Sequence, residues 1–93
     1  MKYEKYHKNL VEIVSKIGND KKLLHGFFTD ILTPKEFDDI STRWEIIKRL
    51  DRNETQRSIA DSLGVGISTV TRGSRELHDT KGGFSEVLKK FKK

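Results

Sequence analysis

The chain has 93 residues, a length typical of one small domain or one subunit of an oligomer. It has no cysteine, which excludes disulfides and cysteine-type zinc sites, and its three histidines follow no metal-ligand spacing. Nineteen Lys and Arg against 14 Asp and Glu give a net charge of +5, which suits a polyanionic partner. Because no apolar run reaches membrane-spanning length and no signal-peptide region opens the chain, we expect a cytoplasmic protein without a membrane partner.

Apolar residues make up only 33% of the chain. Globular domains usually reach about 45–50% on a scale that also includes glycine. A chain with so few apolar side chains has little material for a core of its own. The composition therefore favours a homodimer that completes its core with a second copy, with an isolated monomer as the alternative.

Apolar spacing predicts five or six helices and no strands, and hence an all-α fold. The first helix is marked by Leu10, Ile13, Val14 and Ile17 at helical intervals. Residues 18–20, Gly-Asn-Asp, then supply a C-terminal glycine and the N-cap of the next helix.

The segment from Lys21 to Leu32 is predicted to be a helix with an unusually wide apolar face. Its apolar residues are Leu23, Leu24, Phe27, Phe28, Ile31 and Leu32. Two aromatic and four aliphatic side chains are more than one helix of a small monomer usually hides. We therefore interpret this face as a subunit interface, with an intramolecular core as the alternative.

A well-defined boundary follows at Thr33-Pro34-Lys35-Glu36. Thr33 can cap the next helix, Pro34 suits its first position, and Glu36 can complete a capping box. The apolar stripe of that helix comprises Phe37, Ile40, Trp44 and Ile47, with Ile46 and Leu50 beside it. Residues 1–50 are thus predicted to be dimerisation helices.

After a polar turn, residues 55–78 have the spacing of a helix-turn-helix. The apolar positions where its two short helices must pack are Ile59, Leu63, Val65 and Val70. Ala60 is small where the helices cross, and Gly64 lies in the turn, where a positive φ is needed. Thr55 and Ser68 are the predicted N-caps of the two helices.

The C-terminal part of the chain is predicted to form one more short helix. Lys81-Gly82-Gly83 is expected to end the preceding helix, and residues 84–92 then show helical apolar spacing. The apolar residues are Phe84, Val87, Leu88 and Phe91. We expect the whole chain, 1–93, to form a single domain.

A helix-turn-helix inserts its second helix into the DNA major groove. The residues then expected at base edges and phosphates are Ile67, Ser68, Thr69 and Thr71. Arg57, on the preceding helix, is a candidate for a guanine or a phosphate, or is simply solvated. Ile67 has the alternative of a core position, and Thr71 that of bonding its own helix backbone.

Gly73 is unexpected in this second helix. A glycine in a helix interior costs about 1 kcal/mol relative to alanine. On the residues alone, a helix C-cap at Gly73 is the simplest explanation.

Several short motifs together resemble the tryptophan repressor family. They are Leu32-Thr33-Pro34, Thr42-Arg43, Ile46-Ile47, Gln56-Arg57, Leu63-Gly64, Gly66-Ile67 and Thr71-Arg72-Gly73-Ser74. The resemblance covers about half of the chain, from Leu32 to Leu77. It implies an intertwined homodimer that requires L-tryptophan as corepressor, binds a double-stranded DNA operator, and represses genes for tryptophan biosynthesis or uptake. It also adds Gly66 to the DNA-binding set.

The resemblance offers a second explanation of Gly73. In the family the indole ring lies between two arginines, which match Arg43 and Arg72, with a glycine matching Gly73 against the ring. Guanidinium planes stack on aromatic faces, and Arg72 can also pair with the ligand carboxylate, helped by Thr33. No metal or other cofactor is implied.

Glu76 departs from the family pattern, which has a serine near the ligand ammonium. A carboxylate there can pair with the ammonium or with Arg72, four residues earlier, and then compete with the ligand. The turn before Thr55 is also one residue shorter than usual, and the N-terminal arm is short.

Two alternatives to a tryptophan-dependent repressor remain open on the sequence. One is a ligand-independent helix-turn-helix regulator, and the other is a helical protein-interaction module. An enzyme is not expected, because no paired carboxylates, activated nucleophile or phosphate-binding glycine loop occurs at usable spacing.

Overall fold

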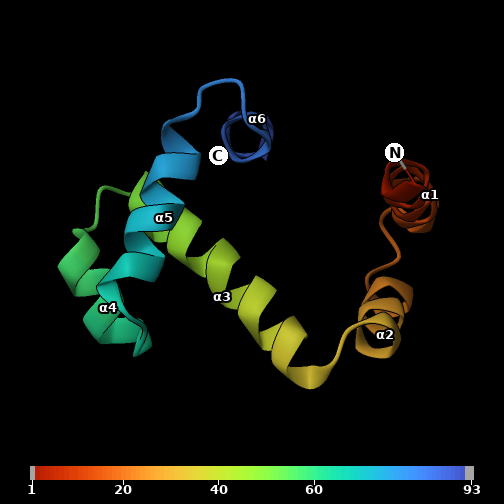
Figure 1. Cartoon of the computed structure of the whole chain (residues 1–93), viewed down its shortest axis with the longest axis horizontal. Coiled ribbons are helices and arrows are strands. Elements are labelled where there is room, and N and C mark those ends of the chain that lie inside the picture. Colours follow the sequence, from red (N-terminus) through yellow and green to blue (C-terminus); the bar gives the residue numbers. More distant parts are fainter. Residues whose placement is uncertain (1, 92–93) are drawn as a thin grey trace. The chain divides into compact units, whose positions relative to one another are not determined.

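The computed structural model describes residues 2–91. Over that range the chain forms helices and no strands, which confirms the all-α prediction (Figure 1). The helices are α1 (Lys2–Ile17), α2 (Lys21–Ile31), α3 (Pro34–Asp51), α4 (Gln56–Leu63), α5 (Ile67–His78) and α6 (Gly83–Phe91). No helix among these residues is long and apolar enough to cross a membrane. The chain divides into two compact units, residues 1–37 and 38–93.

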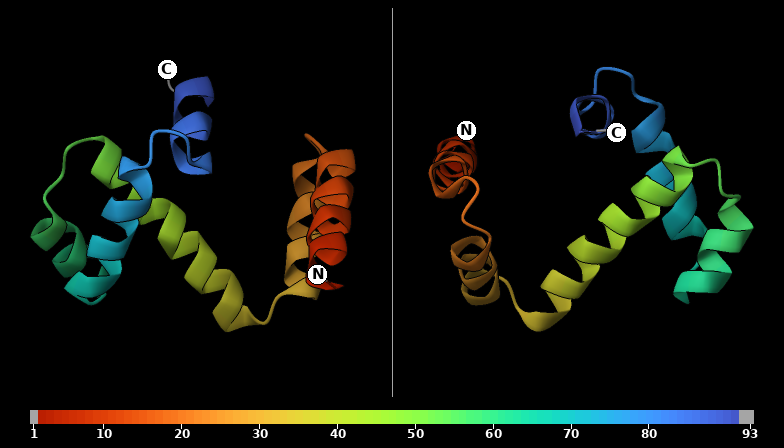
Figure 2. Two further views of the ribbon diagram at one scale, coloured as in Figure 1. Left: turned by 45° about the horizontal axis from the view of Figure 1, so that its top comes forward. Right: turned by 180° about the vertical axis from the view of Figure 1, so that it is seen from behind.

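In the first unit α1 and α2 pack side by side (Figure 2). Gly18 has a φ of 59° in the turn between them. Asp20 is the N-cap of α2, as predicted: its carboxylate accepts a hydrogen bond of 3.0 Å from the Leu23 backbone N–H. Neither helix contains a buried residue within the described range. Their apolar faces, which include Val11 and Leu23, are therefore largely exposed.

The predicted capping box at the start of α3 is confirmed. The Thr33 backbone N–H donates to Glu36 Oε1 at 2.8 Å, and the Glu36 N–H donates to Thr33 Oγ1 at 3.1 Å. Pro34 is the first residue of the helix. One turn later, Phe37 packs edge-on against Phe28, with the ring centroids 6.0 Å apart.

The core of the second unit lies where α3, α4 and α5 meet. Ile46, Ile59, Ala60 and Val70 form its buried cluster. Leu50, Leu63 and Val65 pack against this cluster from its edge. The predicted packing of the two short helices through their apolar positions is confirmed.

In the helix-turn-helix, two of the local features predicted from the sequence are confirmed and one is wrong. Thr55 caps α4 by accepting a hydrogen bond of 3.1 Å from the Ser58 N–H, and Gly64 ends α4 with a φ of 67°. The prediction that Ser68 caps α5 is wrong. Gly66 is the N-cap, without a side-chain bond, because the backbone is extended there and helical from Ile67 onwards.

α5 continues through Gly73 without interruption and ends at His78. The C-cap explanation of Gly73 is therefore wrong. The end predicted at residues 81–83 comes earlier, because Asp79 is extended and is the C-cap. Ser85 Oγ then donates to the carbonyls of Leu77 and Asp79, each at 3.2 Å, and ties the first turn of α6 to the end of α5. Residue 92 of the predicted C-terminal helix lies outside the described residues.

Candidate ligand cavity and nucleic-acid interface

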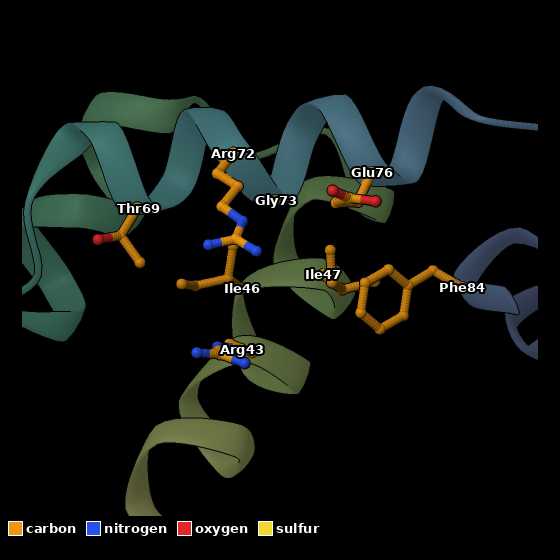
Figure 3. A pocket seen from close by; sticks show the side chains of 8 residues that line it. All are labelled: Arg43, Ile46, Ile47, Thr69, Arg72, Gly73, Glu76 and Phe84. Atoms are coloured by element: carbon orange, nitrogen blue, oxygen red, sulfur yellow. The ribbon is translucent and has the colours of Figure 1, made fainter. Parts of the chain in front are cut away.

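A cavity of about 440 Å³ lies between α3 and α5 and is bounded by one residue of α6 (Figure 3). Its lining residues are Arg43, Ile46, Ile47, Thr69, Arg72, Gly73, Glu76 and Phe84. Small-molecule sites in proteins usually measure about 300–1,000 Å³. The cavity is therefore large enough for a ligand of amino-acid size.

Four of the five residues predicted to bind a ligand line this one cavity. They are Arg43 on α3 and Arg72, Gly73 and Glu76 on α5. Thr33, the fifth, lies in the first unit, where it caps α3. Residues 29 positions apart in the sequence, Arg43 and Arg72, thus meet at one site because α5 lies across the C-terminal half of α3.

Gly73 lies where α5 packs closely against side chains of α3. A Cβ atom at this position would lie 3.1 Å from Ile46 Cγ2 and 3.5 Å from Ile47 Cδ1. The nearer distance is shorter than ordinary van der Waals contact, and Ile46 is fully buried, so it has little room to move. Glycine is therefore needed for helix packing at the wall of the cavity, a reason for Gly73 that the sequence analysis did not identify.

The charged side chains of the cavity are not neutralised by one another. Within residues 2–91, no ion pair joins Arg43, Arg72 or Glu76 to an oppositely charged side chain. Arg72 extends from α5 towards α3, and Glu76 lies one turn further along α5, near Phe84 (Figure 3). Two cationic groups and one anionic group therefore remain available to a ligand that carries both charges.

A chain of polar contacts fixes α4 against α3. Glu45 accepts from Lys48 Nζ at 2.8 Å and from Arg49 Nε at 3.0 Å, and Arg49 Nη1 donates to Ser62 Oγ on α4 at 2.8 Å. These hydrogen bonds, first from Lys48 and then from Arg49, lower the pKa of Glu45. The predicted helix-turn-helix is thus attached to α3 by polar contacts as well as by the core.

The residues predicted to contact DNA lie mainly at the start of α5, and these positions are accessible in the structure. Gly66, Ile67 and Ser68 are exposed there, and so is Arg57 on α4. Ile67 retains 47% of its surface, so the alternative of a core position is wrong. At Gly66 an added Cβ would meet only Ser68 Oγ, at an ordinary contact distance of 3.7 Å.

Thr69 and Thr71 have surroundings that the sequence analysis did not anticipate. Thr69 lines the cavity as well as being exposed. The Thr71 hydroxyl is directed inwards, where Gln56 Oε1 lies at 2.7 Å and its own helix carbonyl, that of Ile67, at 3.0 Å. The backbone-bonding alternative for Thr71 is therefore realised, and Gln56 is a partner that no local pattern indicated.

Phe84 is one of four cavity residues, with Ile46, Ile47 and Thr69, that the sequence analysis did not assign to the ligand site. It was identified only as part of the apolar stripe of a C-terminal helix. Its ring stacks on Trp44 with 6.3 Å between centroids and 30° between planes, and this contact joins α6 to α3. Periodicity marks such a residue as apolar, but it does not indicate which cavity the residue lines.

Comparison with known proteins places this architecture in a family. The sequence model described as "Trp repressor protein" matches residues 5–92. The chain belongs to the Trp repressor family. A Trp operon repressor homolog of Vibrio campbellii is 35% identical over 92 residues, which cover 96% of this chain and 92% of that protein. The Vibrio parahaemolyticus homolog is 34% identical over 96% of this chain and 89% of its own length.

A Trp operon repressor homolog of Chlamydia trachomatis is 39% identical over 71 residues, or 75% of this chain and 76% of that protein. Membership of the Trp repressor family identifies the chain as a DNA-binding transcription regulator and not an enzyme.

Proposed function

We propose that this chain is a homodimeric, cytoplasmic repressor that binds an operator only with L-tryptophan as corepressor, and that it controls genes for tryptophan biosynthesis or uptake. The observation that carries the proposal is the cavity directly beside α5, in which Arg43, Arg72, Gly73 and Glu76 come together. Thr33, on the first unit, is proposed to assist from the other subunit.

The lining of the cavity matches the chemistry of tryptophan. Ile46 and Ile47 provide an apolar surface for the indole, and a guanidinium group can stack on its face. Arg72 is the proposed partner of the carboxylate, since an arginine can bind it through two hydrogen bonds. Glu76 is the proposed partner of the ammonium. Each charged group of the ligand then has an opposite charge in the site.

The position of the cavity suggests how a ligand affects DNA binding. A bound molecule would touch α3 and α5 together, and α5 also carries Ile67 and Ser68, which we propose to contact the DNA groove. If α5 docks well on DNA only in the ligand-filled orientation, ligand and operator each raise the affinity for the other by the same factor. Thr69, which lines the cavity and is exposed, lies between the two binding surfaces.

Dimerisation is supported by the apolar surface of the first unit. Val11 and Leu23 retain 68% and 57% of their surface, and apolar area of this extent normally marks an interface. Two α5 helices related by a two-fold axis would read half-sites about 34–36 Å apart, the spacing common to helix-turn-helix dimers, Trp repressor included.

The proposal is tested by isothermal titration calorimetry of the chain with L-tryptophan, with and without a palindromic operator duplex. We expect binding of L-tryptophan and a large gain in operator affinity when it is present. Absence of heat at millimolar L-tryptophan, together with unchanged operator affinity, would remove the corepressor role.

A matched pair of arginine variants locates the site. Arg72→Gln should weaken L-tryptophan binding by about 10-fold or more, because a hydrogen bond to a charged group contributes about 1.5–3 kcal/mol. Arg75→Gln is the control, since Arg75 is exposed on the same helix and does not line the cavity. Equal effects of the two substitutions on ligand affinity would contradict the assignment.

A ligand-independent DNA-binding regulator is the second candidate, and Glu76 is the observation that favours it. A carboxylate beside Arg72 can take the place of a ligand carboxylate. Operator binding that is tight without L-tryptophan and becomes ligand-dependent in Glu76→Ser would support this candidate. Either regulator should lose operator affinity steeply as salt rises, whereas a helical interaction module shows no such slope on DNA.

A further inference from the structure

The residues of α5 that carry a hydroxyl group have different surroundings. They are Ser68, Thr69, Thr71 and Ser74. The Thr71 hydroxyl is held inside the chain, with Gln56 Oε1 at 2.7 Å and the Ile67 carbonyl at 3.0 Å. Ser74 Oγ lies 3.4 Å from His78 Nδ1, and Thr69 lines the cavity between α3 and α5. Each of these three residues therefore has a place within the chain or at its cavity.

Ser68 has no such place. Gly66 is the N-cap of α5, so the first turn of the helix does not use the Ser68 hydroxyl. Within residues 2–91 this hydroxyl forms no hydrogen bond, and Ser68 does not line the cavity. A serine hydroxyl can both donate and accept a hydrogen bond. The start of α5 therefore carries a hydrogen-bonding group that is available to a molecule outside the chain.

Ser68 also faces away from the core. It precedes Val70 by two residues, which at 3.6 residues per turn places the two side chains on nearly opposite sides of the helix. Val70 is fully buried in the core between α3, α4 and α5. The neighbouring Ile67 retains 47% of its surface. The exposed start of α5 therefore presents an apolar side chain and an available hydroxyl in adjacent residues.

We propose that Ser68 determines base preference, by hydrogen-bonding through its hydroxyl to one base pair in each half-site of the operator. This inference rests on the proposed binding of DNA through the start of α5, but not on L-tryptophan as the corepressor. In the major groove each base pair presents a distinct pattern of donors and acceptors, so a hydroxyl there can distinguish them. A contact to a phosphate carries no such information. The role of Ser68 is thus recognised by a preference at one position rather than by overall affinity.

The test begins with selection of bound sequences from a DNA duplex library with a randomised central segment, with and without L-tryptophan. Affinity is then measured at fixed salt for the selected duplex and for its single base-pair substitutions, made in one half-site at a time. Ser68→Ala should reduce the preference at one position of the half-site by about 3- to 10-fold, the contribution of one neutral hydrogen bond. Preferences at the other positions should be those of the wild type. Alanine is a better helix former than serine, so the variant should keep the wild-type helix content, which circular dichroism checks.

Ser58→Ala is the matched control. Ser58 is an exposed serine on α4, and its backbone N–H, not its hydroxyl, bonds to the Thr55 cap. This variant should keep every base preference of the wild type. Ser68→Ala with wild-type preferences at every position, or with affinity lowered equally for all duplexes, would overturn the proposal. If the wild-type chain selects no sequence under either condition, the proposed operator binding fails, and the role of Ser68 fails with it.

Discussion

Gly73 combines two constraints at a single residue. It lines the cavity, and its α-carbon faces Ile46 so closely that a methyl group would lie 3.1 Å from the isoleucine side chain. Helix propensity alone would favour alanine by about 1 kcal/mol. The glycine is therefore retained against its propensity because two helices meet there.

Gly73→Ala should lower the free energy of unfolding by about 1 kcal/mol, since overpacking a core costs about 1–3 kcal/mol and the gain in propensity offsets part of it. It should also weaken L-tryptophan binding. Gly26→Ala is the control: Gly26 is inside α2, and a methyl group at this position would have nothing within 4 Å, so this variant should be more stable by about 1 kcal/mol. Urea unfolding measures both, and stabilisation by Gly73→Ala would contradict the packing argument.

Two isoleucines of the helix-turn-helix should separate stability from DNA binding. Ile59 is fully buried in the core, and Ile67 retains 47% of its surface at the start of α5. Ile59→Ala should cost about 2–5 kcal/mol of folding free energy. Ile67→Ala should change stability little but reduce operator affinity. Urea unfolding and an operator titration at fixed salt give the two readouts, and normal operator affinity in Ile67→Ala would remove that residue from the interface.

At the scale of the elements, α3 contains a carboxylate, that of Glu45, whose contribution to stability depends on pH. The pKa of Glu45 is lowered by its hydrogen bonds to Lys48 and Arg49. A carboxylate with a lowered folded-state pKa contributes stability that is fully present above its unfolded pKa, 4.5, and is lost as the pH falls through the folded value.

Glu45→Gln should therefore be less stable than the wild type at neutral pH, with the difference shrinking as the pH falls below 4.5. Glu12→Gln is the control, because Glu12 pairs with Lys16 on the exposed face of α1. Thermal midpoints measured across pH 3–7 (a range of roughly 4 units that brackets this carboxyl) compare the three proteins. A pH-independent difference would show that the ionised form of Glu45 is not what stabilises the fold.

The elements themselves could be predicted from sequence because their signals are local. Thr33, Asp20 and Thr55 cap helices through bonds that span three residues, and Gly64 ends α4 through its own φ. The prediction for Ser68 was wrong because serine is a good capping residue by type, but position 68 already lies inside α5.

The missed features depend on contacts between helices. The resemblance to a family brought Arg43 and Arg72 to one site, but no spacing rule could show that Ile46 leaves no room for a side chain at Gly73. The same holds for Phe84, whose partner Trp44 is 40 residues earlier. Such pairs become visible only when the crossing of the helices is known.

For the whole molecule, the exposed apolar faces of α1 and α2 predict self-association. Leu23→Glu should produce a monomer, because a charge at the centre of a buried apolar interface is strongly unfavourable. Operator affinity should then fall by about 100-fold or more, since the second half-site no longer contributes. Lys21→Glu, two residues earlier and also exposed, is the control. Sedimentation equilibrium gives the mass, and a dimeric Leu23→Glu variant would exclude this face from the interface.

The hydrogen bond from the Thr71 hydroxyl to the Gln56 side chain connects α5 directly to α4. Arg57 follows Gln56 directly, so this hydrogen bond connects α5 to the part of α4 that carries the arginine. On the proposed function, a ligand in the cavity could therefore affect Arg57 without contacting it. Thr71→Val removes this hydrogen bond without changing a residue that lines the cavity, so operator affinity should then depend less on L-tryptophan.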